Sequence, residues 1–391
     1  MSIPRLRAYQ GPAILSYGFR PFFLLGSIYA GAMIPLWLGV FAGDLELPTA
    51  FAPRDWHVHE MLFGYVAAIL GGFLLTAIPN WTGRLPLQGT PLAVLVSTWL
   101  AGRIAVLLSG SIGWAAAGAI DAAFLVLLAG AAAREILAGR KWSNLPVVAL
   151  VSLFGVGNIA FHIEAHVEGV ADYSTRFAIA LVITLVSLIG GRIVPSFTRN
   201  WLARQQPGRM PSPFRRLDAI IVALSVLSLV AWIVAPASKI TGAMLMIAGG
   251  LHAVRLARWA GYRTVGDRLV LILHLAYAFV PLGYILSGLA AFDVVPASAG
   301  IHAWTGGAIG SMTIAVMTRA TLGHTGQALK ASIGTQCIYA AVIAAAVMRV
   351  CASVDTAHMH VLLAAAGIGW TAAFLGFALL YGRALCSTRA A

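Results

Sequence analysis

The sequence predicts an all-α polytopic membrane protein of about twelve transmembrane helices. Hydrophobic residues make up 60% of its 391 residues and charged residues only 10%, and the mean hydropathy is +0.87. A soluble domain carries about a quarter charged residues. A soluble fold of this length cannot bury so much apolar surface, so lipid must surround it.

Apolar runs long enough to cross a bilayer recur along the whole chain, and each crossing needs roughly 20 residues. Together they predict one transmembrane domain over residues 1–391. The expected spans lie near residues 21–42, 57–79, 91–109, 113–138, 146–168, 173–195, 217–235, 238–257, 268–290, 297–318, 332–354 and 358–382.

The charges between these runs alternate and predict the orientation. With the N-terminus inside, most of the 26 lysine and arginine residues fall in inside segments, and most acidic residues fall outside. This bias is the positive-inside rule, and it predicts that both termini are cytoplasmic. The net charge of +13 therefore indicates topology and contact with anionic lipid, and it does not indicate a nucleic-acid partner.

Other function classes lack their sequence signals. The first apolar run is long enough to be a span, so no cleavable signal peptide is expected. Cys337, Cys351 and Cys386 form no CxxC or CxxCH motif, which argues against a disulfide framework and covalent c-type haem. No P-loop or dinucleotide-binding motif is present, so an ATP-driven pump is not indicated.

A weak internal repeat relates three of the runs. Gly71, Gly190 and Gly310 recur at spacings of four spans, and Asn80-Trp81 matches Asn200-Trp201 when the alignment is shifted by one residue. One interpretation is three four-helix units around a pseudo-threefold axis. The other is chance similarity between helix ends rich in small residues.

Seven of the ten histidines fall at the predicted outer side. Ionisable residues at membrane depth usually line a functional cavity, and neutral imidazole is a common metal ligand. His162 and His166 share a helix face at i, i+4, as a metal-binding pair would, whereas His57 and His59 can face one site only where the first helical turn is irregular. The outer set comprises His57, His59, His162, His166, His302, His358 and His360. Bonding to water at the headgroups is the alternative, and it is favoured for His358 and His360.

A second set lies at the predicted inner side and comprises His252, His274 and His324. It is a candidate haem or metal site, with hydrogen bonding at helix ends as the alternative. Arg103 lies inside an apolar run and is a candidate cofactor-binding residue, pairing with a haem propionate or with a buried acid such as Asp121, or else reaching toward the interface. Glu60 is a candidate partner of His59, a proton relay or a helix cap.

Four long segments resemble the signature segments of the NnrS family. They are SYGFRPFFLLGSIYA at 16–30, WHVHEMLFGYVAAILGGFLLTAIPNWTG at 56–83, GGRIVPSFTRNWL at 190–202 and GSMTIAVMTRATLGHTG at 310–326. The resemblance implies a bacterial inner-membrane protein that contains haem and copper and acts in denitrification and the response to nitric oxide. It gives a metal role directly to His57, His59 and His324, and we extend that role by position to His162, His252, His274 and His302.

The architecture is also distantly similar to subunit I of haem–copper oxidases, in which helices two and ten supply haem ligands. Here His59 and His302 occupy those spans. The sixth and seventh runs contain no histidine, so the second metal site of those enzymes is missing. A copper site would need other ligands, such as His162 and His166.

These observations favour a haem-bearing redox protein, with one or two haems b and a copper ion, that binds or converts nitric oxide. His59 and His302 are the expected axial ligands of an outer haem. An unidentified electron donor would be needed for a reductase-like reaction. The rivals are a transporter of haem, copper or a small nitrogen species, and a sensor or protective scaffold without turnover.

Overall fold

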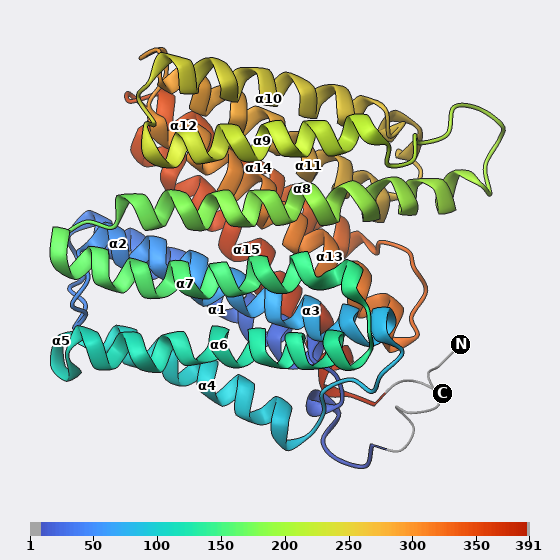
Figure 1. The fold of residues 1–391 in the computed structure, drawn as a ribbon, viewed down its shortest axis with the longest axis horizontal. Helices are drawn as coiled ribbons and strands as arrows, with labels where there is room; N and C mark the ends of the chain where they lie inside the picture. Colours follow the sequence, from blue (N-terminus) through green and yellow to red (C-terminus); the bar gives the residue numbers. More distant parts are fainter. Residues whose placement is uncertain (1–8, 389–391) are drawn as a thin grey trace. The chain divides into compact units, whose positions relative to one another are not determined.

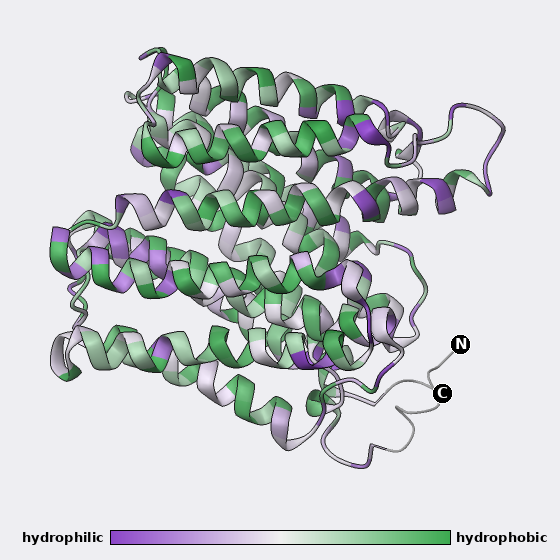
Figure 2. Ribbon diagram, in the orientation of Figure 1, coloured by the Kyte–Doolittle hydropathy of each residue, from purple (hydrophilic) through white to green (hydrophobic). Residues whose placement is uncertain are grey.

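The structure is a computed structural model that describes residues 9–388, and this part of the chain contains helices and no strand. Apolar residues predominate along the helices, and hydrophilic residues gather in loops such as the one that follows α8 (Figure 2). Within residues 9–388, eleven helices are long and apolar enough to cross a membrane. The fold class is therefore confirmed: the chain is an all-α polytopic membrane protein. Arg5, Arg7 and Arg389, which contribute to the predicted orientation, lie outside the described residues.

The twelfth predicted span, near 297–318, is helical but is not among the eleven. It consists of α12 (Ala297–His302), a π-helix η6 (Ala303–Gly310) and α13 (Ser311–Thr325). Gly300, Gly306, Gly307 and Gly310 lower its hydropathy, and three of them, Gly300, Gly307 and Gly310, lie close to neighbouring helices. The Cβ of an alanine at position 307 would lie 2.4 Å from the Phe279 ring, for example.

The chain divides into two compact units. Unit 1 comprises residues 1–178, 320–327 and 377–391, and unit 2 comprises residues 179–319 and 328–376. The predicted grouping into three four-helix units stays a prediction.

In unit 1, α6 packs against both α4 and α7, and α1 packs against α3 and η3 (Figure 1). Two features shape the helix ends. Pro91 and Pro146 occupy the first turns of α4 and α7, where a missing N–H costs nothing, and Gly43 ends α1 in the left-handed conformation with φ 83°. The helices are α1 (Phe19–Ala42), α2 (Pro53–His59), η3 (Glu60–Val66), α3 (Ala67–Thr82), α4 (Thr90–Leu107), α5 (Ser109–Ile112), α6 (Trp114–Ala138) and α7 (Leu145–Glu168).

In unit 2, α10 packs against α9 and α11, and α11 packs against α12 and η6. Asp267 accepts a hydrogen bond from the Leu269 amide, and Ser332 accepts one from the Thr335 amide, which fixes where α11 and α14 begin. The remaining helices are α8 (Asp172–Leu202), α9 (Arg216–Val234), α10 (Lys239–Ala257), α11 (Arg268–Ala290), α14 (Ile333–Val354) and α15 (Met359–Cys386). Three helices, α8, α13 and α15, belong partly to each unit.

Among the residues that the structure describes, each unit contains one π-helix directly after a histidine. In unit 1, α2 ends at His59 and η3 follows; in unit 2, α12 ends at His302 and η6 follows. Single π-helical turns are rare and occur frequently at functional sites. The wider turn changes which residues face the interior beyond each histidine.

Candidate metal centre

Three buried side chains from three helices of unit 1 meet at one point. His59 comes from the end of α2, Asp121 from α6 and His162 from α7, and their ligand atoms all lie within 4.8 Å of one another. His59 Nε2 is 3.1 Å and His162 Nε2 is 3.2 Å from the same carboxylate oxygen, Asp121 Oδ2. The three residues are 0%, 3% and 2% exposed. Two imidazoles and a carboxylate thus converge away from water.

This donor set fits a small metal ion. In a tetrahedral site with bonds near 2.1 Å, ligand atoms lie about 3.4 Å apart, close to the two distances to Asp121 Oδ2. Imidazole with carboxylate suits zinc, copper and iron. His59 Nε2 is buried and makes no well-formed hydrogen bond, which leaves one ring nitrogen in need of a partner.

The residues around the ligands hold them in place. His59 Nδ1 lies 2.8 Å from Glu60 Oε1, in the arrangement by which carboxylates orient metal-binding histidines. Asn158 Nδ2 donates to Asp121 Oδ2 at 2.8 Å. Tyr29 donates to Glu60 through its hydroxyl.

Arg103 joins the two carboxylates of the centre. It donates to Glu60 Oε1 at 2.7 Å and to Asp121 Oδ1. Two carboxylates against one guanidinium leave the buried cluster with one negative charge when the imidazoles are neutral. A cation at the imidazoles, either a metal ion or a proton, would balance that charge.

Glycines bring the helices close enough for these contacts. The Cβ of an alanine at Gly102 on α4 would lie 2.8 Å from Asp121 Oδ1, and one at Gly118 on α6 would lie 3.1 Å from His162 Cγ. An alanine Cβ at Gly64 on η3 would lie 2.8 Å from Arg103 Nη1. The chain therefore has glycine at the positions where these polar side chains need space.

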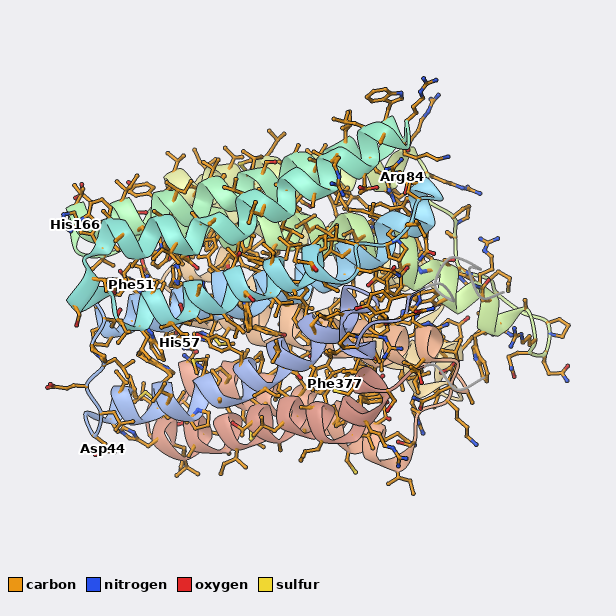
Figure 3. The ribbon with its side chains drawn as sticks, turned by 90° about the horizontal axis from the view of Figure 1, so that it is seen from below. Asp44, Phe51, His57, Arg84, His166 and Phe377 are labelled. Atoms are coloured by element: carbon orange, nitrogen blue, oxygen red, sulfur yellow. The ribbon has the colours of Figure 1, made fainter. Side chains whose placement is uncertain are left out.

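The other predicted outer histidines of unit 1 are not part of this cluster. His57 stacks on Trp37 with ring centroids 4.6 Å apart, and His166 stacks on Trp114 at 4.3 Å. Phe51, His57 and His166 lie toward the same end of unit 1, and Arg84 lies at the opposite end (Figure 3). The irregular backbone follows His59, so His57 and His59 point to different neighbours. A metal role for His57 and His166 stays a prediction.

His324 and His358 have other surroundings. His324, from the predicted inner set, packs against Tyr17 and Phe19, with ring centroids 5.4 Å away in both cases. Burial raises the pKa of Tyr17 to about 12, so the neighbouring phenol stays protonated. His358 is exposed and hydrogen-bonds Asp355, which holds the pKa of that carboxyl below its usual range.

In unit 2, His252 and His274 belong to hydrogen-bond networks. His252 Nε2 lies 2.8 Å from Ser225 Oγ and its Nδ1 lies 3.0 Å from the Tyr277 hydroxyl, so both ring nitrogens have partners. His274 Nε2 lies 2.8 Å from Thr198 Oγ1. A ligand at His252 would first have to displace a hydrogen bond.

His302 Nδ1 lies 2.8 Å from the Ser298 carbonyl oxygen, a bond that makes Nδ1 the protonated nitrogen. That tautomer directs the lone pair to Nε2, as in metal-binding histidines. Ligation of haem by His302, and the inner site, stay predictions.

The sequence predicts Asp121 only as a partner of Arg103 and does not single out Asn158. Asp121 is the one acid in the apolar part of its run, and an intramembrane acid is a functional-site candidate by default. Asn158 precedes His162 by four residues and so shares its helix face. The sequence contains both features, but only the packing of α6 and α7 brings the side chains of Asp121 and Asn158 to His59.

Comparison with curated proteins finds no match for this chain. The family described as NnrS protein matches residues 13–389, nearly the whole chain. The chain therefore belongs to the NnrS family.

Proposed function

We propose that this chain is a membrane metalloprotein of the nitric oxide response, in which His59, His162 and Asp121 hold a metal ion that meets nitric oxide or a related small molecule. The observation that carries the proposal is the buried convergence of these three side chains within 4.8 Å. Membership of the NnrS family supports the link to nitric oxide. Copper is the ion that the resemblance implies, and the imidazoles suit it.

The residues of the cluster have separate roles in this proposal. His59, His162 and Asp121 bind the ion, while Glu60 orients His59 and Arg103 with Asn158 fixes Asp121. When bound, the ion supplies a redox-active or electrophilic centre for a small neutral ligand. The low exposure of the cluster keeps water away from it.

We include haem because the resemblance to the NnrS family implies it. The face of His59 Nε2 is filled by Asp121, and the rings of Phe63 and Phe161 lie within 5.2 Å of the imidazole. These surroundings suit an ion better than a porphyrin, so we place the ion at His59. We keep His302 as the haem ligand to test.

Metal analysis of the purified protein tests the ion. We expect roughly one bound ion per chain, and we expect His59→Ala and His162→Ala each to lose it. His358→Ala, which changes an exposed histidine, is the matched control and should keep the metal. Equal metal content in all four proteins would overturn the site. An absorption spectrum of the same samples tests for haem, whose Soret band should be lost or altered in His302→Ala.

A transporter is the second candidate. Glu60, Arg103 and Asp121 are almost fully buried within membrane-spanning helices, and such residues often mark ion and proton pathways. Liposomes that contain the protein and a trapped copper indicator distinguish the two functions. Uptake driven by a gradient and lost in Asp121→Asn would favour transport, whereas a bound ion without uptake favours the metalloprotein.

A further inference from the structure

One aromatic side chain from a loop lies over both imidazoles of the candidate centre. The Phe51 ring centroid is 5.0 Å from that of His59 and 5.1 Å from that of His162, with the same tilt of 36° to each. Phe51 also meets Phe161 edge-on at 5.5 Å. The residue lies between α1 and α2 and is only half-buried, while the two histidines beneath it are almost fully buried.

The loop that carries Phe51 is fastened to α5. The Ala50 amide donates to Ser109 Oγ at 2.7 Å, Thr49 Oγ1 lies 3.1 Å from the same oxygen, and the Gly110 amide donates to the Pro48 carbonyl at 3.1 Å. Ser109 is 3% exposed and donates a hydrogen bond from its hydroxyl to the Val106 carbonyl oxygen, so its oxygen can accept both loop contacts. The position of the ring is thus set by a specific polar anchor.

The other rings around His59 belong to the interior of unit 1. Phe63 and Phe161 each lie 5.2 Å from the His59 ring, and both are at most 1% exposed. Of the three phenylalanine rings around His59, Phe51 is therefore the one that reaches the surface. Movement of its ring would expose the imidazoles of His59 and His162 to the surface without disturbing the helices.

We infer that Phe51 is the selectivity gate of this site, passing small uncharged molecules and excluding water, anions and hydrophilic chelators. Its hydrocarbon ring offers no polar group, so a charged or strongly hydrated species must lose its water to pass, which is unfavourable. A neutral diatomic molecule loses almost nothing. The inference deepens the proposed function, because the ligand that the gate admits would meet the ion at His59.

The first test needs no metal and so is independent of the proposed function. Exchange of the imidazole C2 proton with heavy water is followed at each histidine by mass spectrometry. We expect Phe51→Ala to speed exchange at His59 and His162 by at least about fivefold, because the covering ring is gone. Phe41→Ala is the matched control: it removes the same ring from the end of α1, where Phe41 packs against Trp37 at a tilt of 45° and not against His59 or His162.

Ser109→Ala provides a second variant that leaves the ring in place and removes its anchor. It should give faster exchange at the same two histidines, by a smaller factor than Phe51→Ala. Exchange at His252, which lies in unit 2, measures any general increase in exchange in every sample. The gate is overturned if exchange at His59 and His162 is unchanged in both variants, or rises no more than at His252.

The second test uses protein loaded with copper and measures how fast EDTA removes it. Phe51→Ala should release copper faster while binding the same amount, and Phe41→Ala should match the wild type. Equal release rates would overturn the gate even where copper is bound. If no protein, the wild type included, binds copper, the proposed function is overturned. The exchange measurement would still decide whether Phe51 is a gate.

Discussion

Arg103 on α4 and Asp121 on α6 form an ion pair inside unit 1, with side chains only 6% and 2% exposed. The same guanidinium also pairs with Glu60, so one cation serves two buried carboxylates. Unit 2 contains a comparable buried pair, Arg255 with Asp218. Each unit therefore holds charged residues in its interior that fixed partners must neutralise.

Replacement of Arg103 by methionine should strongly destabilise the protein. It leaves Glu60 and Asp121 buried without their shared cation, and breaking a buried pair in this way costs about 3–5 kcal/mol. The free energy of unfolding in detergent or bilayers measures the effect. Arg54→Met breaks an exposed pair with Asp172 and should cost at most about 1 kcal/mol. Similar losses in both variants would contradict the role of Arg103.

Gly64→Ala should disturb the centre without removing any functional group. The new methyl carbon would lie 2.8 Å from Arg103 Nη1 and 2.9 Å from the Tyr29 ring, so the guanidinium must shift. We expect a loss of about 1–3 kcal/mol from overpacking, together with weaker metal binding.

Gly130→Ala on α6 is the control for Gly64→Ala, because nothing lies within 4 Å of the added carbon. Alanine is the better helix former, so this variant should gain about 0.5–1 kcal/mol in stability. Opposite signs for the two substitutions are the expected result, measured by thermal unfolding and metal titration. The same sign in both would show that Gly64 is not packed as described.

Tyr277→Phe tests the hydrogen-bond network of unit 2. The phenol accepts from Arg255 Nη1 at 2.9 Å and lies 3.0 Å from His252 Nδ1. Its removal takes this partner from His252 Nδ1 and leaves Arg255 Nη1 with the Ser187 carbonyl oxygen as its acceptor. That should lower the free energy of unfolding by about 1–3 kcal/mol. Tyr262→Phe removes a hydroxyl from a side chain that is 66% exposed and should have almost no effect. No difference between the two would indicate that water replaces the phenol.

The sequence predicts the fold class well because length and hydropathy alone decide whether a segment can span a membrane. It also identifies His59, His162 and Arg103 as candidates, since polar residues within apolar runs are costly and so informative. It does not predict that His57 stacks on Trp37 while His59 joins Asp121, because the register of α2 depends on packing against α1 and α6. Nor does it reveal Phe51, an ordinary loop residue until the anchor at Ser109 places it over two imidazoles.

Glu60→Gln should weaken metal binding at the centre while leaving the ligands in place. Glu60 Oε1 lies 2.8 Å from His59 Nδ1, and a carboxylate in this position makes the imidazole a better donor. Losing such a partner typically lowers metal affinity about 10–100-fold, so the dissociation constant should rise by that factor at unchanged stoichiometry. A titration of metal-free protein with copper and a competing chelator measures it. Glu135→Gln, which alters the surface pair with Arg84, should bind copper as the wild type does. An unchanged dissociation constant in Glu60→Gln would contradict the role of Glu60 in orienting His59.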